Sequence, residues 1–527
     1  MKPKVHSAMM LVLALVANPL AATPTTQLLG TSIEHAAKAF EVPGIAVSVV
    51  HDGKTFYVDG HGVVEVGSSV RVSDRTLFEI GSLSKAFTAA ALAILVDEGK
   101  LKWDDAVIDY LPEFRMHDPW VTREFTIRDL LTHRSGLPLG AGDLLMFPDG
   151  KATPADVIRA LRYLTPASSF RSQFAYDNQL YIVAGEVVAR VANMPFQSFL
   201  EQRLLAPLGM SGCVASADRA APAAERATAH MLVDGKLVTT STRVTPLVAA
   251  AGGVTCDAHG MSNWMSFMLN EGKSPDGKRL VSEEQFGQLT RPVTLLDTPG
   301  YLSEHAGAYL DAYALGWNVS TFYGQPMLSH SGGVWGMTSF IAVLPKQGLA
   351  VFATGNQMSA APRAVVYDIV DQFLRGSVPG AGKDWIAILT KASQERQTAA
   401  TEAVAKASES RNAKSTPSLP LAAYAGTYRD PWYGAVHVSL GKDGQLEFRS
   451  DRNEPLQGPL EHFQYDTFVA RWTDRRLMAD AYVTFLLGAD GTIEGIRMKA
   501  VSPATDFSYD FHDLDLKRVP PEPVDAR

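Results

Sequence analysis

The chain has 527 residues, of which 46% are hydrophobic and 20% are charged, and its formal net charge is −8. This length exceeds what one hydrophobic core usually serves, so we expect two or more domains, and the apolar fraction excludes a disordered chain. No long run of lysine or arginine is present, which argues against nucleic acid as a partner.

The N-terminus has the pattern of an export signal. Lys2 and Lys4 precede an apolar run over residues 8–17, and small residues suited to cleavage follow it. The run is about half of the ~20 residues that a spanning helix needs, which disfavours a membrane anchor. No later segment is long and apolar enough to span a bilayer. We therefore expect a signal peptide over residues 1–22, no stable membrane span, and a periplasmic or secreted protein.

Two cysteines are present, Cys213 and Cys256. In an exported protein they can form a disulfide, but their spacing alone does not establish one. Two free, buried thiols fit the sequence equally well. Both alternatives stay open at this stage.

The predicted elements begin with a hairpin and a buried helix. Residues 43–66 read as two strands joined at the turn Asp52-Gly53. Residues 84–96, "SKAFTAAALAILV", are rich in alanine and leucine and are followed by the stop signal Gly99. This composition predicts a helix that is buried on all sides.

A helical region and a second group of strands follow. Helices and loops fill residues 101–271, and strand signals return from Tyr313 onward, with a turn at 345–348. This order predicts a sheet packed by helices plus a helical subdomain, with the site in a cleft between them. We expect the loops 138–150 and 294–313 to form walls of that site.

The last part of the chain changes character twice. Residues 376–418 are polar and rich in alanine, which is typical of a helix, a linker or both. From residue 419 to 527, short strand patterns alternate with turn signals, including Asp443-Gly444 and Asp490-Gly491. This pattern predicts a small antiparallel β-domain, which we expect to act as a lid near the site or as an oligomer contact.

The chemistry centres on Ser82-Leu83-Ser84-Lys85 at the start of the buried helix. Residues three apart share one helix face, so Ser82 and Lys85 are expected to touch. Burial and the positive end of the helix both favour a neutral lysine, which can take the proton of a serine hydroxyl. Ser84 is the alternative nucleophile, but adjacent residues do not face each other. Alone, such a motif is more often a helix cap followed by a solvated lysine.

Two further motifs follow in order. Tyr176 and Asn178, in "FAYDNQLYIVAGEVV", stand before a predicted helix, where a tyrosine can relay a proton and an amide can hold a substrate carbonyl. His330, Gly332 and Gly333, in "LSHSGGVWGM", follow a predicted strand, where a backbone N–H can join that of Ser82 in an oxyanion hole. In isolation each motif also has a purely structural explanation. The first fits the start of a helix that Asn178 caps, and the second fits a glycine turn.

Taken together, the chain resembles the serine hydrolases related to class C β-lactamases and D-alanyl-D-alanine carboxypeptidases. The resemblance runs over residues 28–372 and includes "FEIGSLSKAFTAAALAILVDEGKLKWDD", "TIRDLLTHRSGLP" and "HSGGVWGMTSFIAVLP". It implies an α+β fold, with an antiparallel sheet flanked by helices over residues 23–375, and a barrel-like C-terminal domain. It also implies that no cofactor or metal takes part.

The resemblance implies roles for the motif residues. It makes Ser82 the acylated nucleophile, Lys85 its base and Tyr176 the proton relay. Substrate binding falls to four residues: Asn178, His330, Gly332 and Gly333, the last as the second oxyanion donor.

Two positions depart from the family pattern. Penicillin-recognising members usually carry lysine where this chain has His330, and a neutral histidine weakens carboxylate recognition. Asp177 would attract a substrate amine if it faced the site, but we expect it to face solvent. His133, in "LLTHRSGLP", is expected to be a satisfied buried histidine beneath the site rather than a partner of the serine.

We therefore expect an exported serine hydrolase that cleaves an ester or amide, including D-amino-acid peptides, through an acyl-enzyme on Ser82. β-Lactamase or D-alanyl-D-alanine carboxypeptidase activity is the first alternative. A weakly catalytic module that binds penicillin or cell-wall peptides is the second. Expected partners are a small-molecule or peptide substrate and, for assembly, further copies of this chain.

Overall fold

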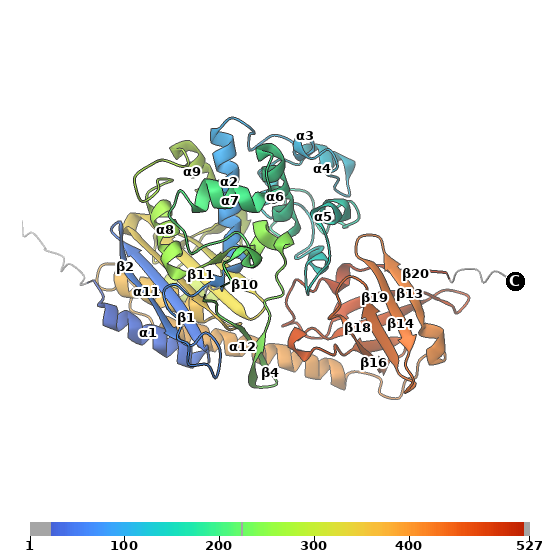
Figure 1. Cartoon of the computed structure of the whole chain (residues 1–527). Coiled ribbons are helices and arrows are strands. Elements are labelled where there is room, and N and C mark those ends of the chain that lie inside the picture. Colours follow the sequence, from blue (N-terminus) through green and yellow to red (C-terminus); the bar gives the residue numbers. More distant parts are fainter. Residues whose placement is uncertain (1–22, 223–224, 521–527) are drawn as a thin grey trace, which may run out of the picture.

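An eight-stranded antiparallel sheet forms the centre of the larger domain (Figure 1). In this computed structural model, residues 23–222 and 225–520 are described, so the predicted signal peptide lies outside the described residues. The strand order is β2-β1-β12-β11-β10-β9-β8-β7. The strands are β1 (Gly44–His51), β2 (Lys54–Gly62), β7 (Thr294–Leu296), β8 (Asp311–Tyr313), β9 (Asn318–Phe322), β10 (Gln325–Val334), β11 (Met337–Leu344) and β12 (Leu349–Gly355).

The sheet is covered on both faces, which explains its continuous apolar strands. Along β11, Phe340 and Ala342 belong to the core under α1 and α11, whereas Ile341 and Val343 belong to the core on the opposite face. The helices α8 and α2 lie on that second face, and α1, α11 and α12 lie on the first (Figure 1). The predicted hairpin is confirmed, because β1 and β2 pair around Asp52 and Gly53, which both have positive φ.

Several helices of the larger domain form the expected helical subdomain, which lies above the sheet in Figure 1. Every residue of α2 from Ser84 to Leu95 is buried, as its alanine-rich sequence predicts. The helices are α1 (Thr26–Ala39), α2 (Ser84–Asp97), α3 (Val107–Tyr110), α4 (Pro119–Glu124), α5 (Pro154–Ala160), α6 (Gln179–Ala192), α7 (Phe196–Leu200), α8 (Ala258–Leu269), α9 (Glu283–Thr290), α10 (Gly300–Ala306), α11 (Ala361–Leu374) and α12 (Trp385–Glu409).

Two short sheets and a disulfide complete this domain. The pairs are β3 (Phe78–Glu79) with β6 (Thr255–Cys256) and β4 (Ala229–Val233) with β5 (Lys236–Thr240). Cys213 and Cys256 form a disulfide, so the alternative of two free thiols was wrong. The bond joins Cys213, which follows α7 in the chain, to Cys256 on β6. The partner of β6 is β3, the strand that precedes Ser82 in the sequence.

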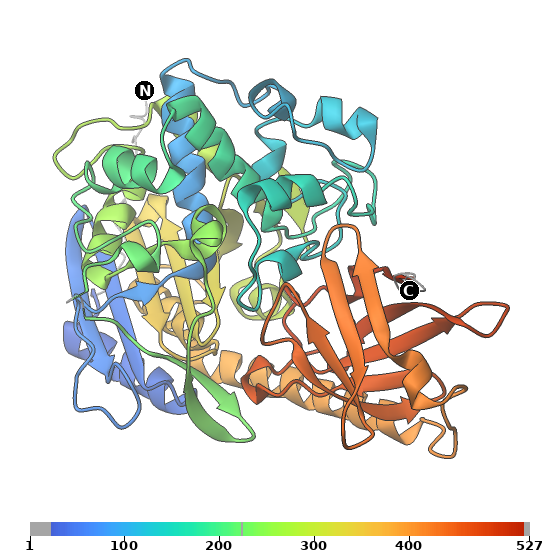
Figure 2. The same cartoon turned by 45° about the vertical axis from the view of Figure 1, so that its right-hand side comes forward.

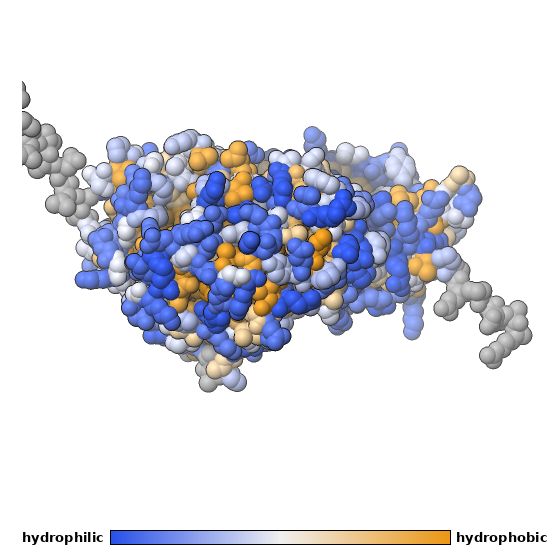
Figure 3. Space-filling view, turned by 90° about the horizontal axis from the view of Figure 1, so that it is seen from above, coloured by the Kyte–Doolittle hydropathy of each residue, from blue (hydrophilic) through white to orange (hydrophobic). Residues whose placement is uncertain are grey.

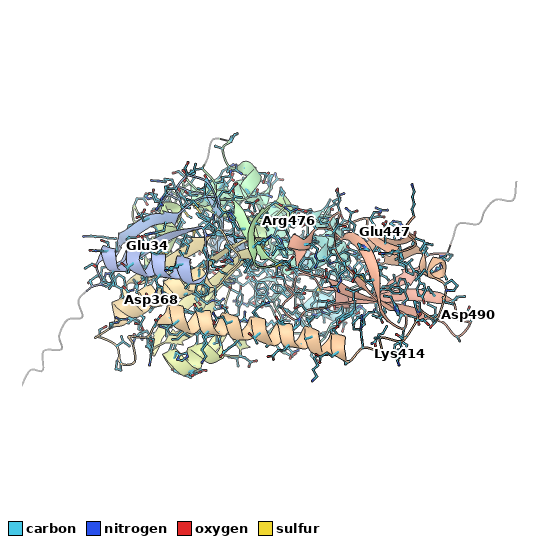
Figure 4. The ribbon with its side chains drawn as sticks, turned by 90° about the horizontal axis from the view of Figure 1, so that it is seen from below. Glu34, Asp368, Lys414, Glu447, Arg476 and Asp490 are labelled. Atoms are coloured by element: carbon cyan, nitrogen blue, oxygen red, sulfur yellow. A yellow bond between two sulfur atoms is a disulfide. The ribbon has the colours of Figure 1, made fainter. Side chains whose placement is uncertain are left out.

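The C-terminal domain is a closed eight-stranded barrel, which confirms the predicted all-β domain. Its strands are β13 (Gly426–Asp430), β14 (Gly434–Leu440), β15 (Leu446–Ser450), β16 (Gln457–Gln464), β17 (Thr467–Ala470), β18 (Ala481–Leu487), β19 (Ile493–Ala500) and β20 (Leu516–Arg518). Helix α12 leads to it along the underside of the molecule, and Lys414 marks the end of this connection (Figure 4).

The barrel packs against the loop region of the larger domain (Figure 2). Asn453 Nδ2 donates to the carbonyl oxygens of Phe147 and Pro148, each at 3.0 Å. Arg243 forms ion pairs with Asp149 and, across the interface, with Asp474. Next to Asp474, Arg476 lies where the barrel meets the β4–β5 hairpin (Figure 4).

The surface seen from above is mainly hydrophilic, with apolar residues scattered over it (Figure 3). None of the helices in the described part of the chain combines the length and the apolar character needed to cross a bilayer.

Candidate active site

Ser82 lies on a short 3-10 turn, η1 (Gly81–Leu83), that leads directly into α2. Gly81 has φ +56°, and a Cβ atom there would lie 2.5 Å from the backbone nitrogen of Gly333. Glycine is therefore required at this position, both for its left-handed backbone and for the close approach of β10. As a result, the partly exposed Ser82 faces the end of β10.

Lys85 is fully buried and its amine contacts three oxygen atoms. Its Nζ lies 3.2 Å from Ser82 Oγ, 2.7 Å from Asn178 Oδ1 and 2.8 Å from the carbonyl oxygen of Ala251. Ala251 belongs to a π-helical turn, η7 (Ala249–Gly253). A neutral amine has two N–H donors and one lone pair. The amide and carbonyl oxygens can take the two donors, which leaves the lone pair for the hydroxyl proton of Ser82.

Burial lowers the pKa of Lys85 to about 7, although the nearby carboxyl groups of Asp143 and Asp177 oppose this shift. A large fraction of the amine is therefore neutral near pH 7, as a general base requires. Ser84, by contrast, is buried, donates to the Gly81 carbonyl at 2.7 Å and accepts from the Val254 N–H at 3.0 Å. Ser84 thus has a structural role, and its hydroxyl is not available for attack.

Tyr176 flanks the serine and the lysine. Its ring centroid lies 4.6 Å from Lys85 Nζ. Burial raises the pKa of Tyr176 well above its usual value, and the nearby Ser82 hydroxyl only partly opposes this. Tyr176 is therefore a neutral phenol that can pass on a proton, while Lys85 is the group poised to accept one.

Asn178 and Asp177 lie at the start of α6 and both are buried. Asn178 Oδ1 accepts from Lys85, and its Nδ2 donates to Asp143 Oδ2 at 2.8 Å. Asp177 does not face solvent, so that expectation was wrong. Its Oδ1 accepts from the Leu180 N–H at 3.1 Å and thereby satisfies one N–H group of the first turn of the helix. Burial raises the pKa of Asp177 to about 7.

His330 lies on β10 and is almost completely buried. Its Nδ1 lies 2.6 Å from the carbonyl oxygen of Ser331, which can only accept, so Nδ1 carries the proton. Its Nε2 then accepts from the Tyr313 hydroxyl at 2.9 Å. Burial and the proximity of Lys85 lower the pKa of His330 to about 3. The imidazole is neutral, and both of its nitrogen atoms have partners within the protein.

His133 lies beneath the site, as expected, with its ring centroid 4.2 Å from that of Tyr176. Its Nδ1 accepts from the Asp177 N–H at 3.1 Å, whereas its buried Nε2 has no hydrogen-bond partner among the described residues. The expectation of a fully satisfied histidine was therefore only partly right. Burial lowers the pKa of His133 well below its usual value.

The two glycines after His330 have different surroundings. A Cβ atom on Gly332 would lie 1.9 Å from the Ile80 carbonyl oxygen, so only glycine lets β10 pack against the chain before Ser82. Gly333 is exposed, and a Cβ atom there would meet nothing closer than Met358 Cε at 3.9 Å. Its backbone nitrogen lies beside Gly81, the residue of η1 that directly precedes Ser82.

Sequence reasoning missed three residues of this site: Asp143, Tyr313 and Ser508. Asp143 and Tyr313 fall in loops that the sequence identified as walls, but nothing singled them out. Ser508 belongs to the barrel, and its hydroxyl donates to Asp143 Oδ2 at 3.0 Å. No local pattern connects positions this far apart in the chain.

The fold and the arrangement of the site are those of the β-lactamase-fold family of serine hydrolases. The beta-lactamase family model matches residues 31–373, and a model described as a domain of unknown function (DUF3471) matches residues 410–518. The chain therefore belongs to the beta-lactamase family.

Proteins similar in sequence are found in Aspergillus and Staphylococcus, and a protein similar in fold is found in Pyrococcus. Unguisins hydrolase ungD' of Aspergillus campestris is 27% identical over 504 residues, which is 89% of this chain and 88% of the relative. Protein flp of Staphylococcus aureus is 25% identical and covers 63% of each chain. The octameric penicillin-binding protein homologue from Pyrococcus abyssi matches 91% of this chain and 99% of its own, with a TM-score of 0.60 and 20% identity. This last similarity concerns the fold alone.

Proposed function

We propose that the protein hydrolyses a neutral ester or amide through an acyl-enzyme on Ser82. One observation carries the proposal: the buried amine of Lys85 lies within hydrogen-bond distance of Ser82 Oγ, and its pKa is lowered to about 7. Among the relatives, a protein named as a hydrolase of unguisins matches along most of both chains, which supports turnover rather than binding alone.

The steps follow from the contacts. Ser82 Oγ attacks the substrate carbonyl carbon while Lys85 Nζ takes the hydroxyl proton. The N–H groups of Ser82 and Gly333 donate to the oxyanion that forms. The proton reaches the leaving group through the Tyr176 hydroxyl, and the leaving group departs. Water then attacks the acyl carbon and gives a proton to Lys85, which returns it to Ser82 Oγ as the acyl–oxygen bond breaks and the acid is released.

The chemistry around His330 narrows the substrate class. With this imidazole neutral and internally bonded, no cation at this position can bind the carboxylate of a β-lactam or of a C-terminal D-alanine. The burial of Asp177 likewise removes the carboxylate that the sequence offered for a substrate amine. Neutral esters and amides, including those of D-amino acids, are therefore favoured over carboxylate-bearing substrates.

The nucleophile is tested with a fluorophosphonate probe on the full chain. We expect one adduct on the peptide that contains Ser82, and neither adduct nor esterase activity in Ser82→Ala. Because Ser84 lies in the same peptide, Ser84→Ala is the matched control, and it should still be labelled. Unchanged turnover in Ser82→Ala would rule out the assignment.

A substrate panel separates the alternatives. It contains a short-chain nitrophenyl ester, D- and L-alanyl nitroanilides and a chromogenic cephalosporin. We expect the ester or the D-alanyl anilide to be turned over faster than the cephalosporin. A preference for the cephalosporin would identify a β-lactamase, and a stable adduct without turnover of any substrate would identify a binding module.

Export and assembly are further parts of the proposal. The pattern of residues 1–22 supports cleavage during export, and the mass of the protein recovered from the periplasm or medium tests it.

A homo-oligomer finds support in the fold shared with a protein described as octameric. Light scattering on the purified protein tests this, and a monomer at all concentrations would exclude it.

A further inference from the structure

A segment of the C-terminal barrel, residues 506–510, reaches the active site of the larger domain. Ser508 Oγ donates to Asp143 Oδ2 at 3.0 Å, across a sequence separation of 365 residues. The same carboxylate oxygen accepts from Asn178 Nδ2 at 2.8 Å, and Asn178 Oδ1 accepts from Lys85 Nζ at 2.7 Å. A continuous chain of hydrogen bonds therefore runs from the barrel to the amine beside Ser82.

Asp510 holds the backbone that carries Asp143. Its two carboxylate oxygens accept from the N–H groups of Gly142 at 2.6 Å and Leu144 at 2.9 Å. These residues flank Asp143 at the start of a helical turn, η3 (Asp143–Leu145), whose first N–H groups need acceptors from elsewhere. Asp510 is completely buried, so this contact is part of the packed interior.

Phe507 lies on the exposed side of the same segment. Its ring meets that of Tyr176 edge-on, with the centroids 5.7 Å apart, and the residue remains 37% exposed. A Cβ atom on Gly140 would lie 2.6 Å from the Phe507 carbonyl oxygen, so the two backbones meet directly. An apolar ring is thus fixed beside the tyrosine that flanks the nucleophile.

We infer that the barrel segment 506–510 is a working part of the active site, in which Ser508 positions the Lys85 amine through Asp143 and Asn178, and Phe507 limits the size of the substrate beside Tyr176. This inference rests on the proposed function, because it needs Ser82 as nucleophile and Lys85 as base. Ser508 is a positioning residue, since it does not reach the reacting atoms.

Ser508 should affect the pH dependence of the reaction, whereas a purely structural residue would not. The groups that influence Lys85 are the carboxyls of Asp143 and Asp177 and the imidazoles of His133 and His330. Burial and the neighbouring Asp177 raise the pKa of Asp143 to about 8, and the Ser508 hydrogen bond partly opposes this rise. The ionised form of Asp143 in turn raises the pKa of Lys85. Removing the hydroxyl should therefore lower the pH at which Lys85 loses its proton.

The Ser508 test compares full-length variants with a neutral nitrophenyl ester. In Ser508→Ala we expect kcat to fall about tenfold, because the chain that orients the amine is broken. We also expect the acid limb of kcat/KM to move to lower pH. Ser508→Thr, which keeps the hydroxyl, should restore both. Ser502→Ala, which lies in the barrel outside residues 506–510, should change neither. Wild-type kcat and pH profile in Ser508→Ala would overturn the positioning role.

The Phe507 test measures the ratio of kcat/KM for a phenylacetyl and an acetyl nitrophenyl ester. In Phe507→Ala we expect this ratio to rise about fivefold or more, because the space beside Tyr176 widens. In Phe507→Trp we expect the ratio to fall, because the larger ring narrows that space. Tyr465→Ala, at an exposed aromatic residue elsewhere on the barrel, should leave the ratio unchanged. An unchanged ratio, or a shift of the same sign in both Phe507 variants, would overturn the size limit.

Failure of this inference is distinguishable from failure of the proposed function. If Ser82→Ala is inactive while the Ser508 and Phe507 variants behave like wild type, only the role of the barrel is wrong. If Ser82→Ala keeps full activity, the proposed function itself is wrong, and the inference falls with it.

Discussion

The Tyr313 hydroxyl lies 2.9 Å from Nε2 of His330 and donates to it, because burial keeps this imidazole neutral. At the position where penicillin-recognising relatives present a cation, this protein therefore presents an uncharged ring whose two nitrogen atoms are both occupied.

Replacing this ring by a cation should redirect the substrate preference. In His330→Lys we expect the ratio of kcat/KM for a cephalosporin and a neutral ester to rise about tenfold or more, because the new charge can pair with the substrate carboxylate. His330→Asn is the uncharged control and should not raise the ratio. If both variants give the wild-type ratio, the charge at this position does not decide the preference.

The pH dependence should report the Lys85 amine. Since the neutral amine acts as base and the pKa is lowered to about 7, kcat/KM for a neutral ester should be half-maximal near pH 7. Below that pH, the rate should fall about tenfold per unit as the amine becomes protonated. Burial raises the pKa of Asp143 to about 8, so only its ionised fraction favours the protonated amine, and Asp143→Asn should shift the profile slightly to lower pH. A flat profile between pH 5 and 9 in the wild type would contradict the role of Lys85.

Gly332 should tolerate no side chain. In Gly332→Ala the new Cβ atom would lie 1.9 Å from the Ile80 carbonyl oxygen, so β10 must move away from η1, and we expect activity to fall at least about a hundredfold. Gly287→Ala is the matched control, because a Cβ atom there meets nothing within 4 Å and alanine favours the helix. Wild-type activity in Gly332→Ala would show that this close approach is not required.

The disulfide should stabilise the fold without taking part in the reaction. It links residues that are 43 apart in sequence, and closing a loop of that length is worth about 4 kcal/mol in the chain-entropy model. The double variant Cys213→Ser, Cys256→Ser should therefore have a lower free energy of unfolding in urea and a lower Tm. Below its melting temperature, its kcat for the ester should match that of the wild type, and an unchanged Tm would contradict the prediction.

The candidate site was predictable wherever neighbours in the sequence are neighbours in space. Ser82 and Lys85 lie one turn apart at the start of an apolar helix, so their contact follows from helix geometry. The hairpin at Asp52-Gly53 and the strand patterns of the barrel follow from equally local signals. The order of the three motifs predicted that Tyr176 and His330 would join them, and the structure brings these residues together.

Only the tertiary structure decided the charges and the outer wall of the site. Asp177 was expected in solvent but accepts from an N–H of α6 within the core, and the neutral state of His330 follows from its burial. The reach of Ser508 to Asp143 depends on how the barrel packs against the larger domain. The sequence by itself determined which groups can do chemistry, because helix spacing and strand alternation act over a few residues. Folding decided their protonation and surroundings, because burial and hydrogen bonding join positions hundreds of residues apart.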